Sequence, residues 1–272
     1  LKPRGPSLSL QLHAAWARSA LSRPMAFRWA RLLPQGAAPA ARSSHTVTAV
    51  GGRVAVFGGE SAPRTAFDRS LHLLSPDNSW RASASEFPAA PLLGHGAAGL
   101  GPMLYVFGGR SGGTTAFDGG ADAERGELFT YNADADEWSE VDAAGAPQWP
   151  EPRSFHAMCV GTSRLYVFGG CGRGGRLNDL WAFDPAASRW ERLHSGGGGA
   201  PVPRGGAALQ AVGAGGGERL VLIYGFSGEQ QGDLAVFDVR AGRWELVPHE
   251  AQCGDVPSPR SVFCAAPLPG GE

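Results

Sequence analysis

The hexapeptide Leu-Tyr-Val-Phe-Gly-Gly occurs twice in this chain, at residues 104–109 and 165–170. Residues 54–59 repeat it as Val-Ala-Val-Phe-Gly-Gly, and residues 221–226 carry the degenerate version Val-Leu-Ile-Tyr-Gly-Phe. Each copy is a short apolar run that ends in or near glycine, which is typical of a buried β-strand followed by a tight turn. The sequence is therefore built on an internal repeat.

Two further markers recur in register with this hexapeptide. An element that usually begins with arginine precedes each copy, and a tryptophan follows each copy after an aromatic or apolar run. Each unit thus holds four short β-type runs, the last two joined by a hairpin turn such as Asp184 to Trp190. The tryptophans that follow the four copies are Trp80, Trp138, Trp190 and Trp244, and Trp29 belongs to the same series as the mark of a blade whose other strands are absent. The upstream elements begin at Arg42, Leu92, Arg153, Arg204 and Arg260.

A four-stranded unit of about 50 residues with Gly-Gly and a late tryptophan is similar to the kelch repeat, which forms one blade of a β-propeller. We expect residues 25–272 to form an all-β, kelch-type β-propeller with four complete four-stranded blades and the start of a fifth. A β-sandwich is the alternative, although it would give no such register. The repeat spacing after Arg260 places the next Gly-Gly beyond residue 272, so we expect a ring truncated at its C-terminal end.

The composition agrees with an all-β chain and limits its partners. The 272 residues include 41 Gly and 21 Pro, which suits a protein with many turns. Lys and Arg number 24 against 25 Asp and Glu, which argues against a nucleic-acid-binding surface. The uncharged stretch 87–109 contains three prolines and six glycines and would make a poor lipid-facing helix. We therefore expect neither a nucleic-acid nor a membrane partner.

The N-terminal segment and the cysteines bear on cellular location. Residues 1–24 carry basic residues among Ser and Ala and no acidic residue, the bias of an organellar transit peptide. The alternative is that this stretch is translated upstream sequence of a fragment. We expect a disordered or transit-like extension and a cytoplasmic protein, with organellar import if the segment is genuine. Four widely spaced cysteines are expected to be reduced and mostly buried: Cys159, Cys171, Cys253 and Cys264.

Two polar positions recur from blade to blade. Three histidines at one position could bind a metal between their imidazoles, or could serve local packing. The arginines that begin the upstream elements could ring one mouth of a channel and attract an anion, or could cap loop carbonyls of a neighbouring blade. Arg110 and Arg176 instead break the repeat on the loop face, which makes them better site candidates. The histidines are His45, His95 and His156.

Taken together, these stretches resemble a group of plant kelch proteins, the nitrile-specifier, epithiospecifier and thiocyanate-forming proteins. The most specific feature is the departure from Gly-Gly at Tyr224-Gly-Phe226. The resemblance covers about residues 26–267, and its other stretches are Phe107-Gly-Gly-Arg110, Arg153-Ser-Phe-His156, Arg176-Leu-Asn-Asp-Leu180, Arg204-Gly-Gly-Ala207 and Arg260-Ser-Val-Phe263.

The resemblance implies a six-bladed propeller that acts on the sulfated aglucone released when myrosinase cleaves a glucosinolate. Such proteins use Fe(II) and direct this anionic substrate to a nitrile, epithionitrile or thiocyanate, a lyase-type activity. By resemblance, the substrate-binding residues are Arg110, Phe155 and Arg176. The family's iron motif, E-x-x-x-D-x-x-x-H, would fall beyond residue 272, and the match at Glu229 and Asp233 has Phe237 in place of His. We therefore assign neither a metal ligand nor a catalytic residue within this chain.

Two other functions stay open. A kelch domain can be a protein–protein interaction module that grips a partner with its loop face and has no catalytic activity. A propeller that binds a carbohydrate or sugar acid is the remaining alternative. The iron motif in downstream sequence would favour the specifier function, whereas a fused BTB or F-box segment would favour the interaction module.

Overall fold

The computed structural model describes residues 31–111, 124–143, 146–213 and 217–266. The chain divides into two units, Leu1–Leu33 and Pro34–Glu272, and every strand of the described ranges belongs to the second unit. The predictions for residues 1–24 and for Trp29 lie outside the described residues. Within the described ranges the structure contains β-strands, one 3-10 turn (η1, His249–Ala251) and no α-helix.

Four antiparallel sheets follow one another along the chain, each with four principal strands. Blade 1 comprises β2 (Thr46–Val50), β3 (Arg53–Phe57), β6 (Leu71–Leu74) and β7 (Ser79–Ala82). Blade 2 comprises β8 (Gly96–Leu100), β9 (Met103–Phe107), β10 (Leu128–Asn132) and β11 (Glu137–Glu140). Blade 3 comprises β13 (Ala157–Val160), β14 (Leu165–Gly172), β15 (Gly175–Asp184) and β16 (Arg189–His194). Blade 4 comprises β17 (Ala208–Val212), β18 (Arg219–Phe226), β19 (Gln230–Asp238) and β20 (Arg243–Val247).

Short strands extend this pattern. β1 (Gln35–Gly36) pairs in parallel with the outer strand β7, and β12 (Arg153–Ser154) pairs with the end of β14. β4 (Glu60–Ala62) and β5 (Thr65–Ala66) form a small hairpin in the loop that leaves β3.

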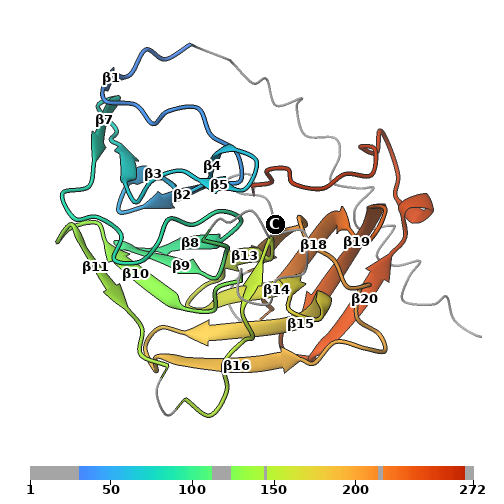
Figure 1. Cartoon of the computed structure of the whole chain (residues 1–272). Helices are drawn as coiled ribbons and strands as arrows, with labels where there is room; N and C mark the ends of the chain where they lie inside the picture. Colours follow the sequence, from blue (N-terminus) through green and yellow to red (C-terminus); the bar gives the residue numbers. More distant parts are fainter. Residues whose placement is uncertain (1–30, 112–123, 144–145, 214–216, 267–272) are drawn as a thin grey trace, which may run out of the picture. The chain divides into compact units, whose positions relative to one another are not determined.

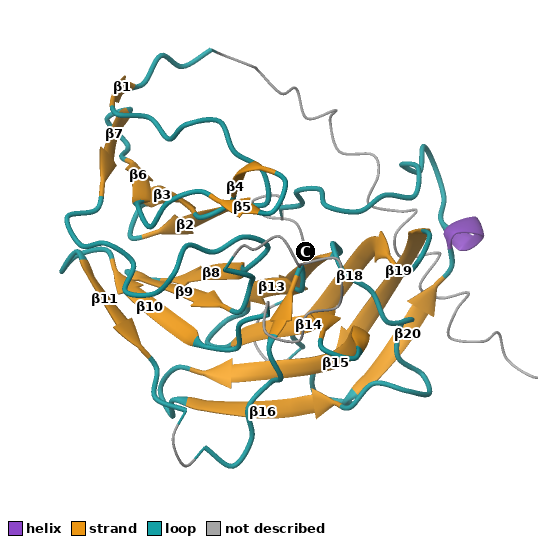
Figure 2. Ribbon diagram, in the orientation of Figure 1, coloured by secondary structure: helices purple, strands orange, loops and turns teal. Residues whose placement is uncertain are grey.

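The four sheets are arranged as the blades of a β-propeller (Figures 1 and 2). Consecutive blades contact one another through their first strands, β2 with β8, β8 with β13, and β13 with β17. The outer strands β7, β11, β16 and β20 lie at the periphery in Figure 2. The predicted all-β fold with four four-stranded blades is confirmed, and the β-sandwich alternative is wrong.

The Gly-Gly pairs join each blade to the next. The second glycine of each pair donates its N–H to the carbonyl of the residue at the arginine position of the following blade. In blade 3, Gly170 N donates to Arg204 O at 2.9 Å with φ +98°, a value that favours glycine. A Cβ at Gly170 would lie 2.7 Å from Ser154 O, so only glycine fits. The equivalent bonds run from Gly59 to Leu92, Gly109 to Arg153, and Gly225 to Arg260.

A second series of backbone bonds links the turns that precede the first strands. Each turn contains a residue with positive φ, and its N–H donates to the carbonyl of the same position in the preceding blade at 2.6–3.0 Å. The fifth upstream element takes part in both series, which places the start of a fifth blade beside blade 4 as predicted. The linked residues are Ser44, Gly94, Phe155, Gly206 and Val262.

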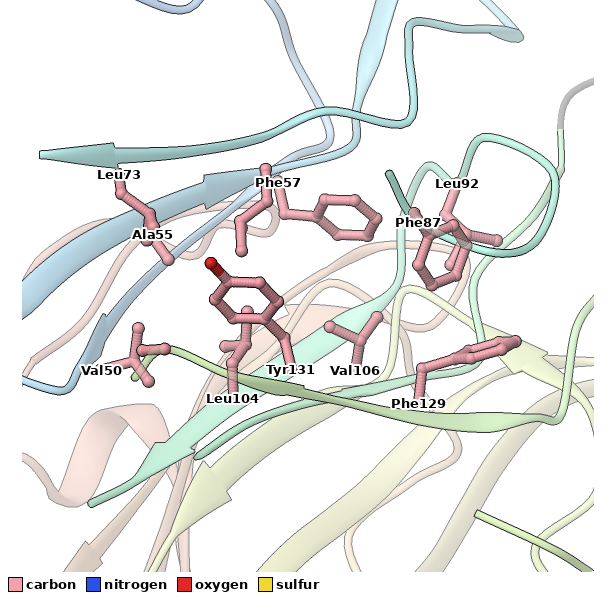
Figure 3. Packing of buried hydrophobic residues seen from close by; sticks show 12 residues of the cluster. Val50, Ala55, Phe57, Leu73, Phe87, Leu92, Leu104, Val106, Phe129 and Tyr131 are labelled. Atoms are coloured by element: carbon pink, nitrogen blue, oxygen red, sulfur yellow. The ribbon is translucent and has the colours of Figure 1, made fainter. Parts of the chain in front are cut away.

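The apolar cores lie between blades, and Figure 3 shows the one between blades 1 and 2. The phenylalanine of each Phe-Gly-Gly contacts the tryptophan of the following blade: Phe57 with Trp138 at 5.2 Å between ring centroids, and Phe107 with Trp190 at 5.1 Å. Phe168 and Trp244 repeat the contact at 5.4 Å. The recurring tryptophan therefore seals the core between its own blade and the preceding one.

Two smaller predictions can be compared with the fold. Among the described residues no helix is long and apolar enough to cross a bilayer, and the uncharged stretch 87–109 includes β8 and β9. All four cysteines are free thiols. Cys159 is buried and Cys171 is half-buried, but Cys253 and Cys264 are exposed. The prediction of mostly buried cysteines is wrong for these two because they lie in the irregular chain that follows β20.

Candidate functional site

The arginines that begin the upstream elements are structural rather than ligand-binding. Arg153 is fully buried, and its guanidinium donates to both carboxylate oxygens of Asp179 at 2.7 and 2.9 Å and to Gly169 O at 3.0 Å. Arg204 repeats this geometry with Asp233 at 2.6 and 2.8 Å. Burial would raise the pKa of Asp179, but the hydrogen bonds and charge of Arg153 hold it below its ordinary value.

The predicted anion-binding ring of arginines is therefore wrong for these positions. Arg153 and Arg204 each bind an aspartate within the third strand of their own blade. They also bind a carbonyl, but in the same blade and not in a neighbouring one as the alternative had it. Arg42 follows the pattern with Asp68 at 3.1 Å and Gly58 O at 3.1 Å. Arg260 is exposed and donates to Ser258.

The recurring histidines serve packing between blades. His95 lies 5.2 Å from the Phe57 ring, and its Nε2 is 2.9 Å from Thr46 Oγ1. His156 lies 5.4 Å from the Phe107 ring. Burial lowers the pKa of His95 to about 3, with a smaller contribution from His45, and burial with Arg153 and His95 nearby lowers that of His156. In the described part of the chain no group of three His, Cys, Asp or Glu residues could hold a metal ion, so the metal alternative is wrong for these histidines.

The repeat-breaking residues gather at the end of the blades where the Gly-Gly pairs lie. Arg110 follows directly after Gly109 and is bonded to Glu124: Nε lies 2.9 and 2.7 Å from the two carboxylate oxygens, and Nη2 lies 2.6 Å from Oε1. A backbone bridge between the same two residues fixes this arrangement. Only 7% of the Glu124 side chain is exposed, so the ion pair is largely removed from water.

Blade 3 adds three residues in a row across its strands. Ser154 is the register partner of Cys171, and Cys171 is the register partner of Arg176. Directly opposed residues in antiparallel strands place their side chains on the same face of the sheet. Ser154 Oγ donates to Glu124 Oε1 at 2.9 Å, which connects this row to Arg110 of blade 2.

Blade 4 and the turn before β13 supply two aromatic rings. The Arg176 guanidinium lies 4.8 Å from the ring centroid of Phe226, a cation–π contact. Phe226 forms a backbone bridge with Gly205, and a Cβ at Gly205 would lie 3.3 Å from Cys171 Sγ. Phe155 is half-buried in the positive-φ turn and directs its ring toward Gly94.

These seven residues form one group, which we call the blade-end cluster. Its members share the Gly-Gly end of blades 2, 3 and 4, and the contacts are continuous from Arg110 through Glu124, Ser154 and Cys171 to Arg176. Burial raises the pKa of the Cys171 thiol, while the charges of Arg176 and Arg110 oppose this rise and Glu124 adds to it. The cluster consists of Arg110, Glu124, Ser154, Phe155, Cys171, Arg176 and Phe226.

The structure therefore brings Arg110 and Arg176 to the same end of the propeller, with Phe155 in the turn between their blades. Their availability differs, because Arg110 is held by Glu124 whereas none of the ion pairs among the described residues involves the exposed Arg176. Sequence reasoning missed Glu124, although its backbone pairing with Arg110 repeats the pairing of Cys171 with Arg176 in blade 3. It also missed the partnership of Ser154 with this carboxylate.

An Fe(II) site, which the resemblance implies, does not fit the described residues, since they contain no suitable group of three or more ligating side chains. Glu229 and Asp233 do not supply one either, because Asp233 is bound by Arg204. No chemical step at this site is therefore assigned to iron.

Several known proteins are similar to this chain. N-(sulfonatooxy)prop-2-enimidothioate sulfolyase of Thlaspi arvense is 26% identical over 183 residues, which cover 64% of this chain and 50% of that protein. Leucine-zipper-like transcriptional regulator 1 of Homo sapiens is 36% identical over 175 residues, which cover 62% of this chain and 20% of that protein. Acyl-CoA-binding domain-containing protein 5 of Arabidopsis thaliana is 39% identical over 99 residues, 35% of this chain and 15% of that protein.

This chain thus spans half or less of the length of these relatives. The family model described as the KLHDC2/KLHL20/DRC7 Kelch-repeats domain matches residues 44–269, which is most of the chain and all four blades. Together with the Gly-Gly bonds and the tryptophan contacts between blades, this match shows that the chain belongs to the KLHDC2/KLHL20/DRC7 family of kelch-repeat domains.

Proposed function

We propose that this kelch domain binds a small organic anion at the blade-end cluster, and that the ligand is a sulfated glucosinolate aglucone whose breakdown the protein directs toward a nitrile or related product. The observation that carries the proposal is the state of Arg176. Its guanidinium is exposed and stacked on Phe226, so its N–H groups can donate to an anionic oxygen.

The other predicted substrate-binding residues fit this arrangement. Phe155 offers an aromatic ring to the apolar side chain of the ligand, and Arg110 adds a second positive charge at the same blade end. The similarity to the Thlaspi arvense sulfolyase, whose name specifies a sulfonatooxy compound, supports a sulfated ligand. Fe(II) remains part of the proposal through the family resemblance alone, because the described residues contain no group that fits it.

The test is the product ratio of glucosinolate hydrolysis. A glucosinolate is cleaved by myrosinase with and without the purified complete protein and Fe(II), and the nitrile and isothiocyanate are quantified by gas chromatography. We expect the complete protein to raise the nitrile fraction when Fe(II) is present, and Arg176→Ala to abolish the increase. Arg173→Ala is the matched control, since Arg173 is an exposed arginine of the same hairpin. A nitrile fraction that the wild-type chain leaves unchanged contradicts the proposal.

A protein-interaction module is the second candidate, and the exposure of Arg176 favours it too. A guanidinium that solvent reaches freely can bind an acidic side chain of a protein partner as well as a small anion. Under this alternative the product ratio does not change, while Arg176→Ala weakens capture of the partner and Arg173→Ala does not. The two functions are therefore separated by the same pair of variants.

A further inference from the structure

We propose that Glu124 is a specificity-determining residue that restricts the blade-end cluster to ligands with a single negative charge. This inference rests on the proposed function, since it concerns the ligand that Arg176 binds. It is carried by the contacts of Glu124, which places a carboxylate of the protein itself against one of the two guanidiniums.

The Glu124 carboxylate binds the Arg110 guanidinium in the way that an external anion would. Three hydrogen bonds of 2.6–2.9 Å join the guanidinium to both carboxylate oxygens, and Ser154 Oγ donates a fourth at 2.9 Å. Arginine–carboxylate contacts of this kind are among the strongest hydrogen bonds in proteins. To bind Arg110, a ligand must first displace the Glu124 carboxylate, whose side chain is only 7% exposed. Arg110 therefore forms few direct hydrogen bonds with an incoming anion.

The same carboxylate sets the charge of the cluster. Arg110 and Arg176 contribute two positive charges and Glu124 one negative charge, which leaves a single net positive charge among these three groups. A monoanion such as a sulfate ester or a carboxylate bound at Arg176 balances that charge. The second charge of a dianion such as a phosphate monoester would have no counterpart and would be repelled by Glu124.

Backbone and register keep Glu124 close to the ligand-binding end. Glu124 is tied to Arg110 by a backbone bridge, and Ser154 lies two strands away from Arg176 in the order β12, β14, β15. Because Glu124 accepts a hydrogen bond from Ser154, its carboxylate lies about two strand spacings, or ~10 Å, from the position of Arg176.

The test compares two aryl esters of similar size, phenyl sulfate and phenyl phosphate, by isothermal titration calorimetry at pH 7.5. Phenyl phosphate is a dianion at this pH because its second pKa lies near 6. We expect the wild-type chain to bind phenyl sulfate more tightly than phenyl phosphate. Glu124→Gln keeps a hydrogen-bonding side chain but removes the charge. It should raise the affinity for phenyl phosphate about tenfold more than it raises the affinity for phenyl sulfate. This factor is the effect of one unit charge at ~10 Å with an effective dielectric constant near 20.

Glu191→Gln is the matched control, because it removes a carboxylate that pairs with Arg164 on the outer part of blade 3. It should leave both affinities unchanged. A ratio of affinities that stays the same in Glu124→Gln overturns the inference. If phenyl sulfate binding itself is absent, or is retained in full by Arg176→Ala, the proposed function fails instead, so the two failures are distinguishable.

A second measurement needs no variant. Lowering the pH from 7.5 to 5.5 converts most of the phenyl phosphate to the monoanion, whereas phenyl sulfate keeps one charge throughout. The wild-type chain should bind phenyl phosphate more tightly at pH 5.5 relative to phenyl sulfate at the same pH. A relative affinity that falls or stays constant contradicts a carboxylate that repels the second charge.

Discussion

Replacing Arg153 by leucine tests whether the buried arginine–aspartate pair within blade 3 stabilises the fold. Leucine is the informative choice because Leu92 occupies the same repeat position in blade 2. In blade 2 the acidic residue directly before the third strand, Glu127, pairs instead with Arg125. Among the described residues Arg153 is the only arginine that pairs with Asp179. Arg153→Leu therefore leaves a carboxylate that has lost both guanidinium bonds.

The size of the effect follows from the burial of the pair. Removing one partner of a buried ion pair costs about 3–5 kcal/mol, because the remaining charge is poorly hydrated. Asp179 is 16% exposed and keeps a hydrogen bond from Trp181 Nε1 at 2.7 Å, which places the expected loss near the lower end of that range. We therefore expect Arg153→Leu to lower the free energy of unfolding by about 3 kcal/mol.

Urea unfolding followed by tryptophan fluorescence measures this loss. Arg164→Leu is the control, since it breaks the exposed pair with Glu191 and should cost about 0–1 kcal/mol. The double variant Arg153→Leu with Asp179→Leu should recover at least half of the loss, because no unpaired charge remains. The reasoning is refuted if the single variant loses less than ~1 kcal/mol, or if the double variant is no more stable than the single one.

Two further predictions concern histidine and glycine. The lowered pKa values of His95, to about 3, and of His156 mean that the unfolded chain takes up protons before the folded one does. The contribution of these histidines to the free energy of unfolding should therefore be complete above pH 6.5. It should fall as the pH drops, by up to about 1.4 kcal/mol per pH unit for each histidine. A urea midpoint that stays constant from pH 7.5 to 5 argues against this. Gly99→Ala should lose ~1–3 kcal/mol by overpacking, since a Cβ there would lie 2.0 Å from Ala49 O of the adjacent blade. Gly174→Ala, where the Cβ meets open space, should change little, and equal thermal midpoints for the two variants would show that the close approach is unimportant.

The repeat made the fold predictable, because its three markers each have a fixed structural task. Gly170 donates to Arg204 of the next blade, Trp190 packs on Phe107 of the preceding blade, and Arg153 begins the first element of its own blade. Such positions recur at constant spacing, so their roles can be inferred without coordinates. The same logic identified Arg110 and Arg176 as departures from the repeat.

The candidate site was less predictable, because its decisive contacts join side chains whose identities differ from blade to blade. Glu124 meets Arg110 across a blade 2 loop, and Ser154 reaches it from blade 3. The role of the upstream arginines was also mistaken in part, although a signal was present: Asp68 and Asp179 each lie 26 residues after their arginine. A recurring acidic partner at that separation indicates a structural ion pair rather than a ligand site.

The contact between each Phe-Gly-Gly phenylalanine and the tryptophan of the following blade gives assembly a direction. Phe107 is covered by Trp190 only after the outer strand of blade 3 has been synthesised. A chain emerging from the ribosome therefore keeps the trailing side of its newest blade uncovered while the earlier ones are already sealed. We expect the domain to fold one blade at a time from its N-terminal side. A chain that stops early should then expose apolar surface only on the last blade that was synthesised.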